Sequence, residues 1–241
     1  MIPVDVELWA RDAGRALARG DLVIVIDALR SGTCIVNALA NGAEALIPTL
    51  SLREAHRLRS QHPEFPLAGE RGGKKPAGFD LGNSPLEFTR ANVEGKTVVI
   101  TTTSGTAALV KSQKAATVLI GAFLNAGAVA EKAEEIATDE KVGISFVLAG
   151  DKGKFSLEDS LCAGAIVEGF KPSSAVLSDK ARISLLAFKT AKSNLVKNVM
   201  ETTHARHLVD LGFKEDVVFS CRLNTSRLVP IYKNTRIVLA N

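Results

Sequence analysis

The chain has 241 residues, of which 46% are hydrophobic, 23% are charged and only 5% are aromatic. A chain this apolar buries enough surface to offset the entropy lost on folding, which excludes an intrinsically disordered protein. The net charge of +4 comes from 30 basic and 26 acidic residues scattered along the chain, with one Trp and one Tyr. This pattern lacks the basic, aromatic stripe of a nucleic-acid-binding protein and suits a small anionic substrate.

The apolar runs and the cysteines of the sequence indicate the cellular compartment of the protein. Leu22–Ile26 is typical of the apolar runs, which are far shorter than the roughly 18 residues of a membrane span. Asp5 and Glu7 lie where a signal peptide would have a basic start and a long apolar stretch. The three cysteines are odd in number and widely spaced, which favours reduced thiols. We therefore expect a cytoplasmic protein without membrane contact.

Short β-branched runs between polar turns predict strands, and the segments between them have helical periodicity. The predicted strands are Leu22–Ile26, Ala45–Pro48, Thr97–Thr101, Thr117–Ile120, Val142–Leu148, Val217–Phe219 and Arg236–Leu239. The predicted helices are Cys34–Ala40, Leu52–Ser60, Thr106–Gln113, Ala126–Thr138, Leu157–Gly169 and a long one across Ser178–Met200. This alternation predicts an α/β fold with three layers (α/β/α) and a mixed, largely parallel sheet covered on both faces.

A weak internal repeat is present in the first half of the chain. A strand, a Ser-Gly-Thr turn, a helix and a second strand occur twice, with an offset of 73 residues from Ser31 to Ser104. Chance similarity between two βαβ units explains this equally well. If the repeat is real, two similar turns present hydroxyls and backbone amides at helix N-termini. The helix N-termini that follow the two turns favour anions.

Residues 69–89 do not read as a regular element. Five glycines and two prolines exclude a helix or a central strand, and a connection this long is most often functional. Its Glu70 and Arg71 offer a metal ligand or base beside an anion clamp. A further turn, Ala149–Lys154, leads to a helix whose first turn contains Glu158 and Asp159. These two carboxylates either complete a helix cap with Ser156 or bind a hard cation.

Several common catalytic motifs are missing from the sequence. It contains no GxxxxGK[ST] loop, no GxGxxG after a strand and no GxSxG elbow. His204 and His207 share one helix face without the glutamate of an HExxH motif, so we interpret them as solvated or capping side chains. Cys34 and Cys162 open helices and are read as small core residues rather than nucleophiles.

Several blocks of the sequence together resemble the 2-phosphosulfolactate phosphatase family, over about residues 22 to 232. The most specific are Gly-Glu-Arg-Gly-Gly at 69–73 and Gly-Phe-Asp-Leu-Gly-Asn-Ser-Pro at 78–85. Further matches lie at residues 25–30, 37–43, 101–106, 123–126, 155–159, 161–165, 212–216 and 229–230. The resemblance implies a magnesium-dependent acid phosphatase that hydrolyses 2-phospho-3-sulfolactate to 3-sulfolactate and phosphate, a step of coenzyme M biosynthesis. It also implies two similar α/β/α lobes, which we expect over residues 1–125 and 126–241, packed as one unit with the site between them.

The sequence departs from the family pattern at two places. Gly32 stands where the family usually has a hydroxyl side chain, and Ser104 stands where asparagine is common. The substrate could therefore be another small phospho-hydroxy acid, and a non-catalytic anion-binding protein on the same fold is the remaining alternative.

A substrate with phosphate, sulfonate and carboxylate groups needs cations, amides and hydroxyls around it. The expected substrate-binding residues are Arg30, Ser31, Thr33, Arg71, Gly72, Thr102, Thr103, Ser104 and Gly105. The expected magnesium ligands are Asp27, Glu70, Glu158 and Asp159, with Asp27 and Glu70 also catalytic. Leu29 replaces the second carboxylate of an Asp-x-Asp nucleophile motif, which favours direct attack by a metal-oriented water on phosphorus. We expect a homodimer.

Overall fold

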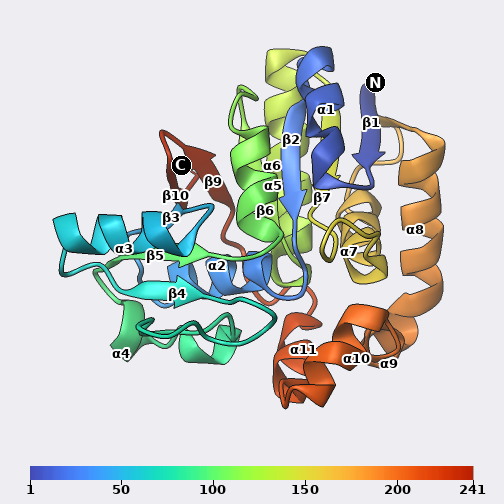
Figure 1. Ribbon diagram of the computed structural model, residues 1–241. Helices are drawn as coiled ribbons and strands as arrows, with labels where there is room; N and C mark the ends of the chain where they lie inside the picture. Colours follow the sequence, from blue (N-terminus) through green and yellow to red (C-terminus); the bar gives the residue numbers. More distant parts are fainter. Residues whose placement is uncertain (241) are drawn as a thin grey trace.

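A computed structural model describes residues 1–240 as an α/β fold on a single ten-stranded sheet (Figure 1). The strands are β1 (Ile2–Glu7), β2 (Leu22–Ile26), β3 (Ala45–Pro48), β4 (Leu67–Gly69), β5 (Thr97–Thr101), β6 (Val118–Gly121), β7 (Ile144–Leu148), β8 (Ala175–Leu177), β9 (Pro230–Lys233) and β10 (Arg236–Leu239). The α-helices are α1 (Ala13–Arg19), α2 (Ser31–Ala40), α3 (Leu52–Gln61), α4 (Arg90–Val93), α5 (Gly105–Ser112), α6 (Ala126–Glu140), α7 (Leu157–Glu168), α8 (Asp179–Ala191), α9 (Leu195–Met200), α10 (Thr203–Asp210) and α11 (Lys214–Ser220).

The sheet consists of two parallel groups of strands joined by one hairpin. Its order is β4-β5-β3-β10-β9-β6-β2-β7-β1-β8. The pairs β4–β5, β5–β3, β6–β2, β2–β7, β7–β1 and β1–β8 are parallel. The β9–β10 hairpin pairs antiparallel with β3 on one side and β6 on the other, so the two groups run in opposite directions. The predicted mixed, largely parallel sheet is confirmed.

The repeated segments both form strand–helix–strand units. The first is β2-α2-β3 and the second is β5-α5-β6, and each starts in one parallel group and ends in the other. If β2 is interchanged with β5, β3 with β6 and β9 with β10, the central order β5-β3-β10-β9-β6-β2 is reproduced when it is read in reverse. The arrangement brings the first turns of α2 and α5 together, since a Cβ on Gly105 would lie 2.7 Å from Cβ of Ser31. The division of the chain at residue 125 stays a prediction.

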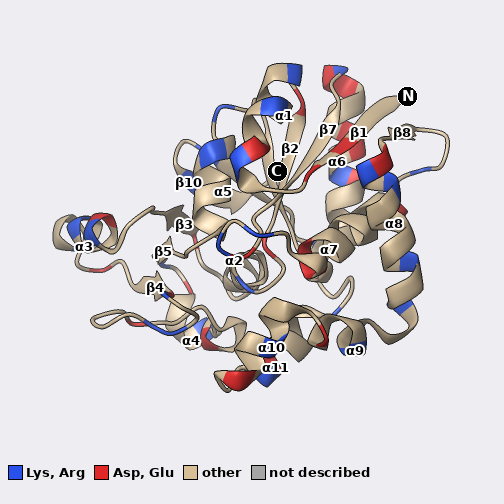
Figure 2. Ribbon diagram, turned by 45° about the vertical axis from the view of Figure 1, so that its right-hand side comes forward, with Lys and Arg blue, Asp and Glu red and all other residues tan. Residues whose placement is uncertain are grey.

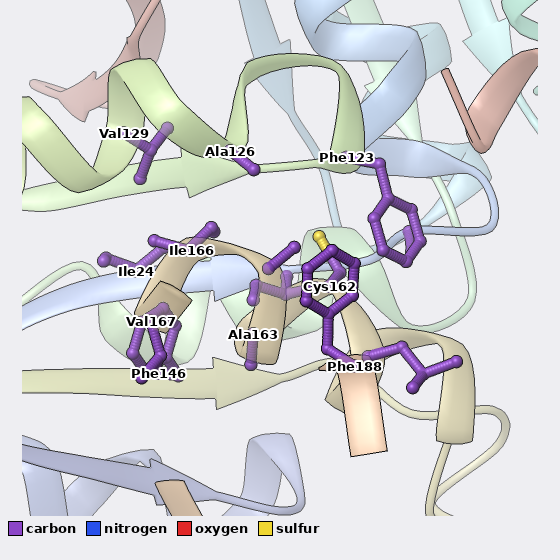
Figure 3. Packing of buried hydrophobic residues seen from close by; sticks show 14 of the residues in the cluster. Ile24, Phe123, Ala126, Val129, Phe146, Cys162, Ala163, Ile166, Val167 and Phe188 are labelled. Carbon is purple, nitrogen blue, oxygen red and sulfur yellow. The ribbon is translucent and has the colours of Figure 1, made fainter. Parts of the chain in front are cut away.

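Helices cover the two faces of the sheet with apolar side chains. Alternate residues of β2 point to opposite faces: Ile24 packs with α6 and α7, whereas Val23 packs with α1, α2 and α5. Figure 3 shows the first of these layers, where Phe146 of β7 and Phe188 of α8 meet the small side chains of α7. Burial of this kind contributes about 25 cal/mol per Å² of apolar surface and holds the strand ends in place beneath the site.

Two of the expected elements are wrong in type or extent. Val217–Phe219 lies in α11 rather than in a strand. The negative charges of Glu215 and Asp216 in its first turn interact favourably with the helix dipole. The strand was predicted from the three apolar residues alone, which contain no sign of this helix start. The expected helix across Ser178–Met200 is split into α8 and α9 by a 3₁₀ turn over residues 192–194. The strands β1, β4, β8 and β9 were not predicted, because most of them are short or at the sheet edge.

Charged residues are distributed over the surface rather than concentrated in one stripe. Lys and Arg occur on α1, α3, α5 and α8, with acidic residues between them (Figure 2).

Among residues 1–240, none of the helices has the length and apolar character needed to cross a membrane. The three cysteines are buried and carry free thiols, and burial raises the pKa of the Cys34 thiol well above its usual range. A thiol in that state is unreactive, as expected from the sequence.

Candidate functional site

A pocket lies beyond the carboxyl ends of four strands, two from each parallel group. The loop after β2 contributes Asp27, the loop after β4 Glu70, the loop after β5 Thr102, and the loop after β7 Gly150. The pocket contains about 460 Å³ of space free of protein atoms, part of which is open to solvent. Ligand sites in open α/β sheets form beyond the carboxyl ends of the strands. The loops with Asp27, Glu70 and Thr102 were expected to form the site from the sequence.

Asp27 is a buried carboxyl group at the floor of the pocket. Its Oδ1 accepts a hydrogen bond of 3.3 Å from the amide of Ser31 in the first turn of α2. No residue within 1–240 donates a hydrogen bond to its Oδ2. Burial raises the pKa of Asp27 to about 6, the positive charge of His204 opposes this, and the charges of Glu70 and Glu158 add to it. Asp27 is therefore a poorly solvated carboxyl group with one oxygen available to a ligand.

Glu70 holds the glycine-rich loop against the start of α5. Its Oε2 accepts the amide of Gly73 at 2.8 Å, and its Oε1 accepts the amide of Thr103 at 2.7 Å. Burial would raise its pKa, but these amides and the charge of Arg71 hold the pKa of Glu70 below its usual range. A glycine is required just before it, because Gly69 has φ +146° and a Cβ there would overlap the Thr101 carbonyl oxygen.

Arg30 connects the pocket to the C-terminal helices. Its Nη1 donates to Oδ2 of Asp216 at 2.6 Å, and its Nη2 donates to the carbonyl oxygen of Gly73 at 2.8 Å. The guanidinium also lies over the ring of Phe213, 4.3 Å from its centroid. Oδ1 of Asp216 accepts the hydroxyl of Ser84 at 2.7 Å. Arg30 lines the pocket, but much of its hydrogen-bonding capacity is used by the protein itself.

The structure places the expected substrate-binding residues in two groups. Those that line the pocket are Arg30, Gly72, Thr102, Thr103 and Ser104. The others, Ser31, Thr33, Arg71 and Gly105, lie outside its lining.

Hydrogen bonds within the protein engage two residues of the second group, Thr33 and Arg71. The hydroxyl of Thr33 donates to the carbonyl oxygen of Ala28, and Nη2 of Arg71 donates to Oγ1 of Thr101. Oγ of Ser31 is buried and has no hydrogen-bond partner among the described residues.

Glu158 and Asp159 are both buried in the first turn of α7. The expected cap is present, because Oγ of Ser156 accepts the amide of Asp159 at 3.1 Å. The carboxylate of Asp159 accepts the amides of Ala28 and Gly150, at 2.8 and 3.0 Å, and so ties the loops after β2 and β7 together. Burial and the charges of Asp27 and Glu158 raise its pKa well above the usual range.

His204 is part of this site, and its interpretation as a solvated or capping residue is wrong. Its Nδ1 lies 3.1 Å from Oε1 of Glu158, its side chain is 21% exposed, and its ring lines the pocket. Burial would lower its pKa, but the hydrogen bond to Glu158 and the charges of Glu158, Asp27 and Asp151 raise the pKa of His204. The helical spacing of His204 and His207 was visible in the sequence, but the folding of α10 back over the strand ends was not.

Three further residues of the pocket were not expected in the site from the sequence, although His207 is exposed, as its interpretation as a solvated side chain predicted. Lys152 and His207 bring exposed positive or protonatable groups to its rim. Asn83 brings a side-chain oxygen, Oδ1, that is buried and has no partner among residues 1–240. Such an atom is expected to meet a ligand or water, because a buried polar atom without a partner is costly.

The four expected metal ligands do not form one cluster. Within the part of the chain that is described, no three His, Cys, Asp or Glu side chains are grouped as a metal site. Glu70 and Asp159 use both carboxylate oxygens for backbone amides, and Glu158 pairs with His204. Asp27 and Glu158 each keep one oxygen, Oδ2 and Oε2, that accepts no hydrogen bond from the described residues, and Glu158 is already paired with His204 through its other oxygen. Magnesium commonly binds one or two carboxylates, waters and substrate phosphate, so Asp27 fits that ion in kind.

Comparison with known proteins decides the family. The sequence model described as 2-phosphosulpholactate phosphatase matches residues 11–235. This chain belongs to the 2-phosphosulfolactate phosphatase family. A "Probable 2-phosphosulfolactate phosphatase" of Caldanaerobacter subterraneus is 40% identical over 215 residues, covering 88% of each chain. Proteins of the same description from Thermotoga petrophila and Clostridium acetobutylicum are 38% and 35% identical, over 90% and 98% of this chain and 91% and 99% of their own. The family resemblance seen in the sequence is confirmed, and all four loops of the pocket fall inside the matched range.

Proposed function

We propose that this protein hydrolyses 2-phospho-3-sulfolactate to 3-sulfolactate and phosphate in the cytoplasm, as a step of coenzyme M biosynthesis. The observation that carries the proposal is the pocket at the strand ends of a chain that matches this family over residues 11–235. The pocket combines one available carboxylate oxygen with backbone amides and positive side chains, which suits a small ester with three acidic groups. The buried free thiols agree with a reducing compartment.

The phosphoryl group would bind at the start of α5. The amides of Thr103 and Thr106 are used by Glu70 and Thr102, whereas the amide of Ser104, a residue that lines the pocket, donates no hydrogen bond within residues 1–240. The N-terminus of an eight-residue helix adds partial positive charge at this point. Lys152 and His207 at the rim would bind the sulfonate and carboxylate groups. Glu70 would act by fixing the two amide-bearing loops relative to each other.

Asp27 is the proposed magnesium ligand and lies beside the phosphoryl site. Magnesium, when bound, supplies charge neutralisation to the phosphoryl oxygens. Asp27 offers Oδ2 as a ligand. Both this oxygen and the unpartnered hydroxyl of Ser31 lie close to Gly105. With Leu29 in place of a second carboxylate, we propose direct attack of water on phosphorus without a phosphoenzyme.

A panel of esters tests the substrate. The enzyme should release phosphate from 2-phosphosulfolactate with a higher kcat/KM than from 2-phospholactate or 2-phosphoglycerate. A preference for a carboxylate-only ester would reassign the substrate to another phospho-hydroxy acid. Binding without phosphate release from any of these esters would favour an anion-binding protein.

Gly105→Ala tests the contact between α5 and Asp27. The added Cβ would overlap Oδ2 of Asp27 and lie 2.7 Å from Cβ of Ser31. We expect kcat to fall by about 100-fold, because displacement of a reacting group by about 1 Å costs this much. Gly14→Ala is the matched control, since a Cβ there meets nothing within 4 Å. Equal activity of the two variants, measured by phosphate release, would remove Asp27 from the reaction.

The proposed homodimer has a candidate interface on α7 and α8. Ile183 and Leu186 are 64% and 58% exposed and line a groove together with Leu157. Exposed apolar patches of this kind are typical of protein interfaces. Light scattering after size exclusion should give twice the chain mass of 25.5 kDa for the wild type and the monomer mass for Ile183→Glu. A wild-type monomer at micromolar concentration would contradict the dimer.

A further inference from the structure

His204 and Glu158 form a paired unit that the sequence assigned to other roles. Glu158 is in the first turn of α7, and its side chain is 2% exposed. His204 is in the first turn of α10, a helix whose N-cap, Thr202, accepts the amide of Ala205. The two side chains come from elements 46 residues apart and meet at 3.1 Å. Among the described residues, His204 is the one positively chargeable group within 4 Å of the Glu158 carboxylate.

The geometry gives the two ring nitrogens of His204 different tasks. An ionised carboxylate can only accept, so the Nδ1–H of His204 donates to Oε1 of Glu158. The ring lines the pocket that also contains Asp27 and Glu70. Nε2 is therefore the nitrogen left for a ligand. A buried carboxylate that fixes the tautomer and orientation of a histidine is the arrangement that catalytic histidines use.

We propose that His204 is the general acid of the reaction and that Glu158 positions its ring. The proposal rests on the proposed phosphatase activity. The leaving group of an alkyl phosphate ester is a strongly basic alkoxide, which departs readily only if it is protonated as the bond breaks. Arg30 is also held by a buried carboxylate, that of Asp216, but a guanidinium does not give up its proton. In the described part of the chain, His204 is therefore the one side chain of the pocket that both can donate a proton and is held by a buried carboxylate.

Protons and charges are conserved in this step without a further reactant. Water attacks phosphorus, the bond between phosphorus and the ester oxygen breaks, and the Nε2 proton of His204 passes to that oxygen. The products are the free hydroxyl of 3-sulfolactate, dihydrogen phosphate and neutral His204. Dihydrogen phosphate then returns one proton to Nε2, which leaves hydrogen phosphate and a protonated ring. The Oε1 hydrogen bond keeps the ring in one orientation throughout.

The test compares four enzymes in the phosphate-release assay with 2-phosphosulfolactate: wild type, His204→Gln, Glu158→Gln and His62→Gln. His204→Gln should lower kcat by about 100- to 10,000-fold with KM changed less than about threefold. Glu158→Gln should lower kcat by about 10- to 100-fold, because it acts through His204. His62→Gln should match the wild type, since His62 pairs with Glu64 on the surface, at 3.4 Å.

Three results separate the proposal from its alternatives. An unchanged kcat in His204→Gln would overturn the proposal. A rise in KM without a fall in kcat would also overturn it, because it would show that His204 only binds the substrate as a cation. For Glu158→Gln, the Nδ1 proton resonance of His204 is the readout that a purely structural role would not move. It should lie downfield in the wild type and move upfield in the variant, because the neutral amide oxygen of glutamine accepts a weaker hydrogen bond than the carboxylate. An unmoved resonance would overturn the positioning role. A wild-type enzyme that releases no phosphate would instead refute the proposed function.

Discussion

Replacing Asp27 with asparagine is expected to lower kcat for 2-phosphosulfolactate by at least about a thousand-fold, a loss of about 4 kcal/mol of transition-state stabilisation. Asparagine keeps the size of the side chain and can still accept the amide of Ser31, but it loses the charge on the one unused oxygen. The measurement is steady-state phosphate release with saturating magnesium. Asp139→Asn, at an exposed position on α6, is the control and should have wild-type activity.

The same variant should be at least as stable as the wild type, which separates lost chemistry from lost folding. Burial holds the folded-state pKa of Asp27 at about 6, above its usual value of 3.8. An acid whose pKa is raised on folding binds more protons in the native state, so its contribution to stability falls as pH rises between these values. In EDTA, Asp27→Asn should therefore melt higher than the wild type above pH 6, and the gain should vanish below about pH 4. A variant that melts lower at pH 7 would contradict this.

Removing Asp216 is expected to destabilise the protein by about 3–5 kcal/mol, because it leaves the buried guanidinium of Arg30 without its carboxylate partner. Both side chains are almost fully buried, at 2% and 3% exposure. Urea denaturation of Asp216→Ala measures the loss. Glu215→Ala is the matched control, because it changes the neighbouring carboxylate of the same helical turn, which is exposed, and should shift the free energy of unfolding by less than about 0.5 kcal/mol.

A second variant keeps this prediction testable if Asp216→Ala does not fold. The double variant Arg30→Met with Asp216→Leu removes both charges and should recover most of the stability, since apolar replacement of a buried ion pair is often neutral or favourable. Asp216→Ala within 1 kcal/mol of the wild type would show that water or another group compensates the Arg30 charge. The link between α11 and the pocket would then have no energetic basis.

The sequence was sufficient for the parts of the fold that depend on local patterns. β2, β3 and β5 have the predicted bounds, because β-branched runs between polar turns define buried parallel strands. The cap at Ser156 followed from the acidic first turn of α7. The loops that carry Asp27 and Glu70 were placed at the strand ends by the rule for open α/β sheets.

The remaining parts depend on contacts between distant residues. Arg30 was expected to bind the substrate, but its partner Asp216 lies 186 residues away, just before a segment that was predicted as a strand. His204 was read as a surface residue, because its partner Glu158 is on another helix. The central hairpin β9–β10 joins two parallel groups only when the C-terminal segment returns to the middle of the sheet. Local periodicity contains no information on such long-range pairings.

We propose that the pocket containing Asp27 hydrolyses a phosphate ester with the help of a bound divalent cation. The most direct measurement is phosphate release from 2-phosphosulfolactate by the wild-type protein, with magnesium and again after its removal with EDTA. We expect steady turnover with magnesium, loss of turnover in EDTA and recovery on adding magnesium back. No phosphate release under either condition, or equal release with and without the metal, would contradict it.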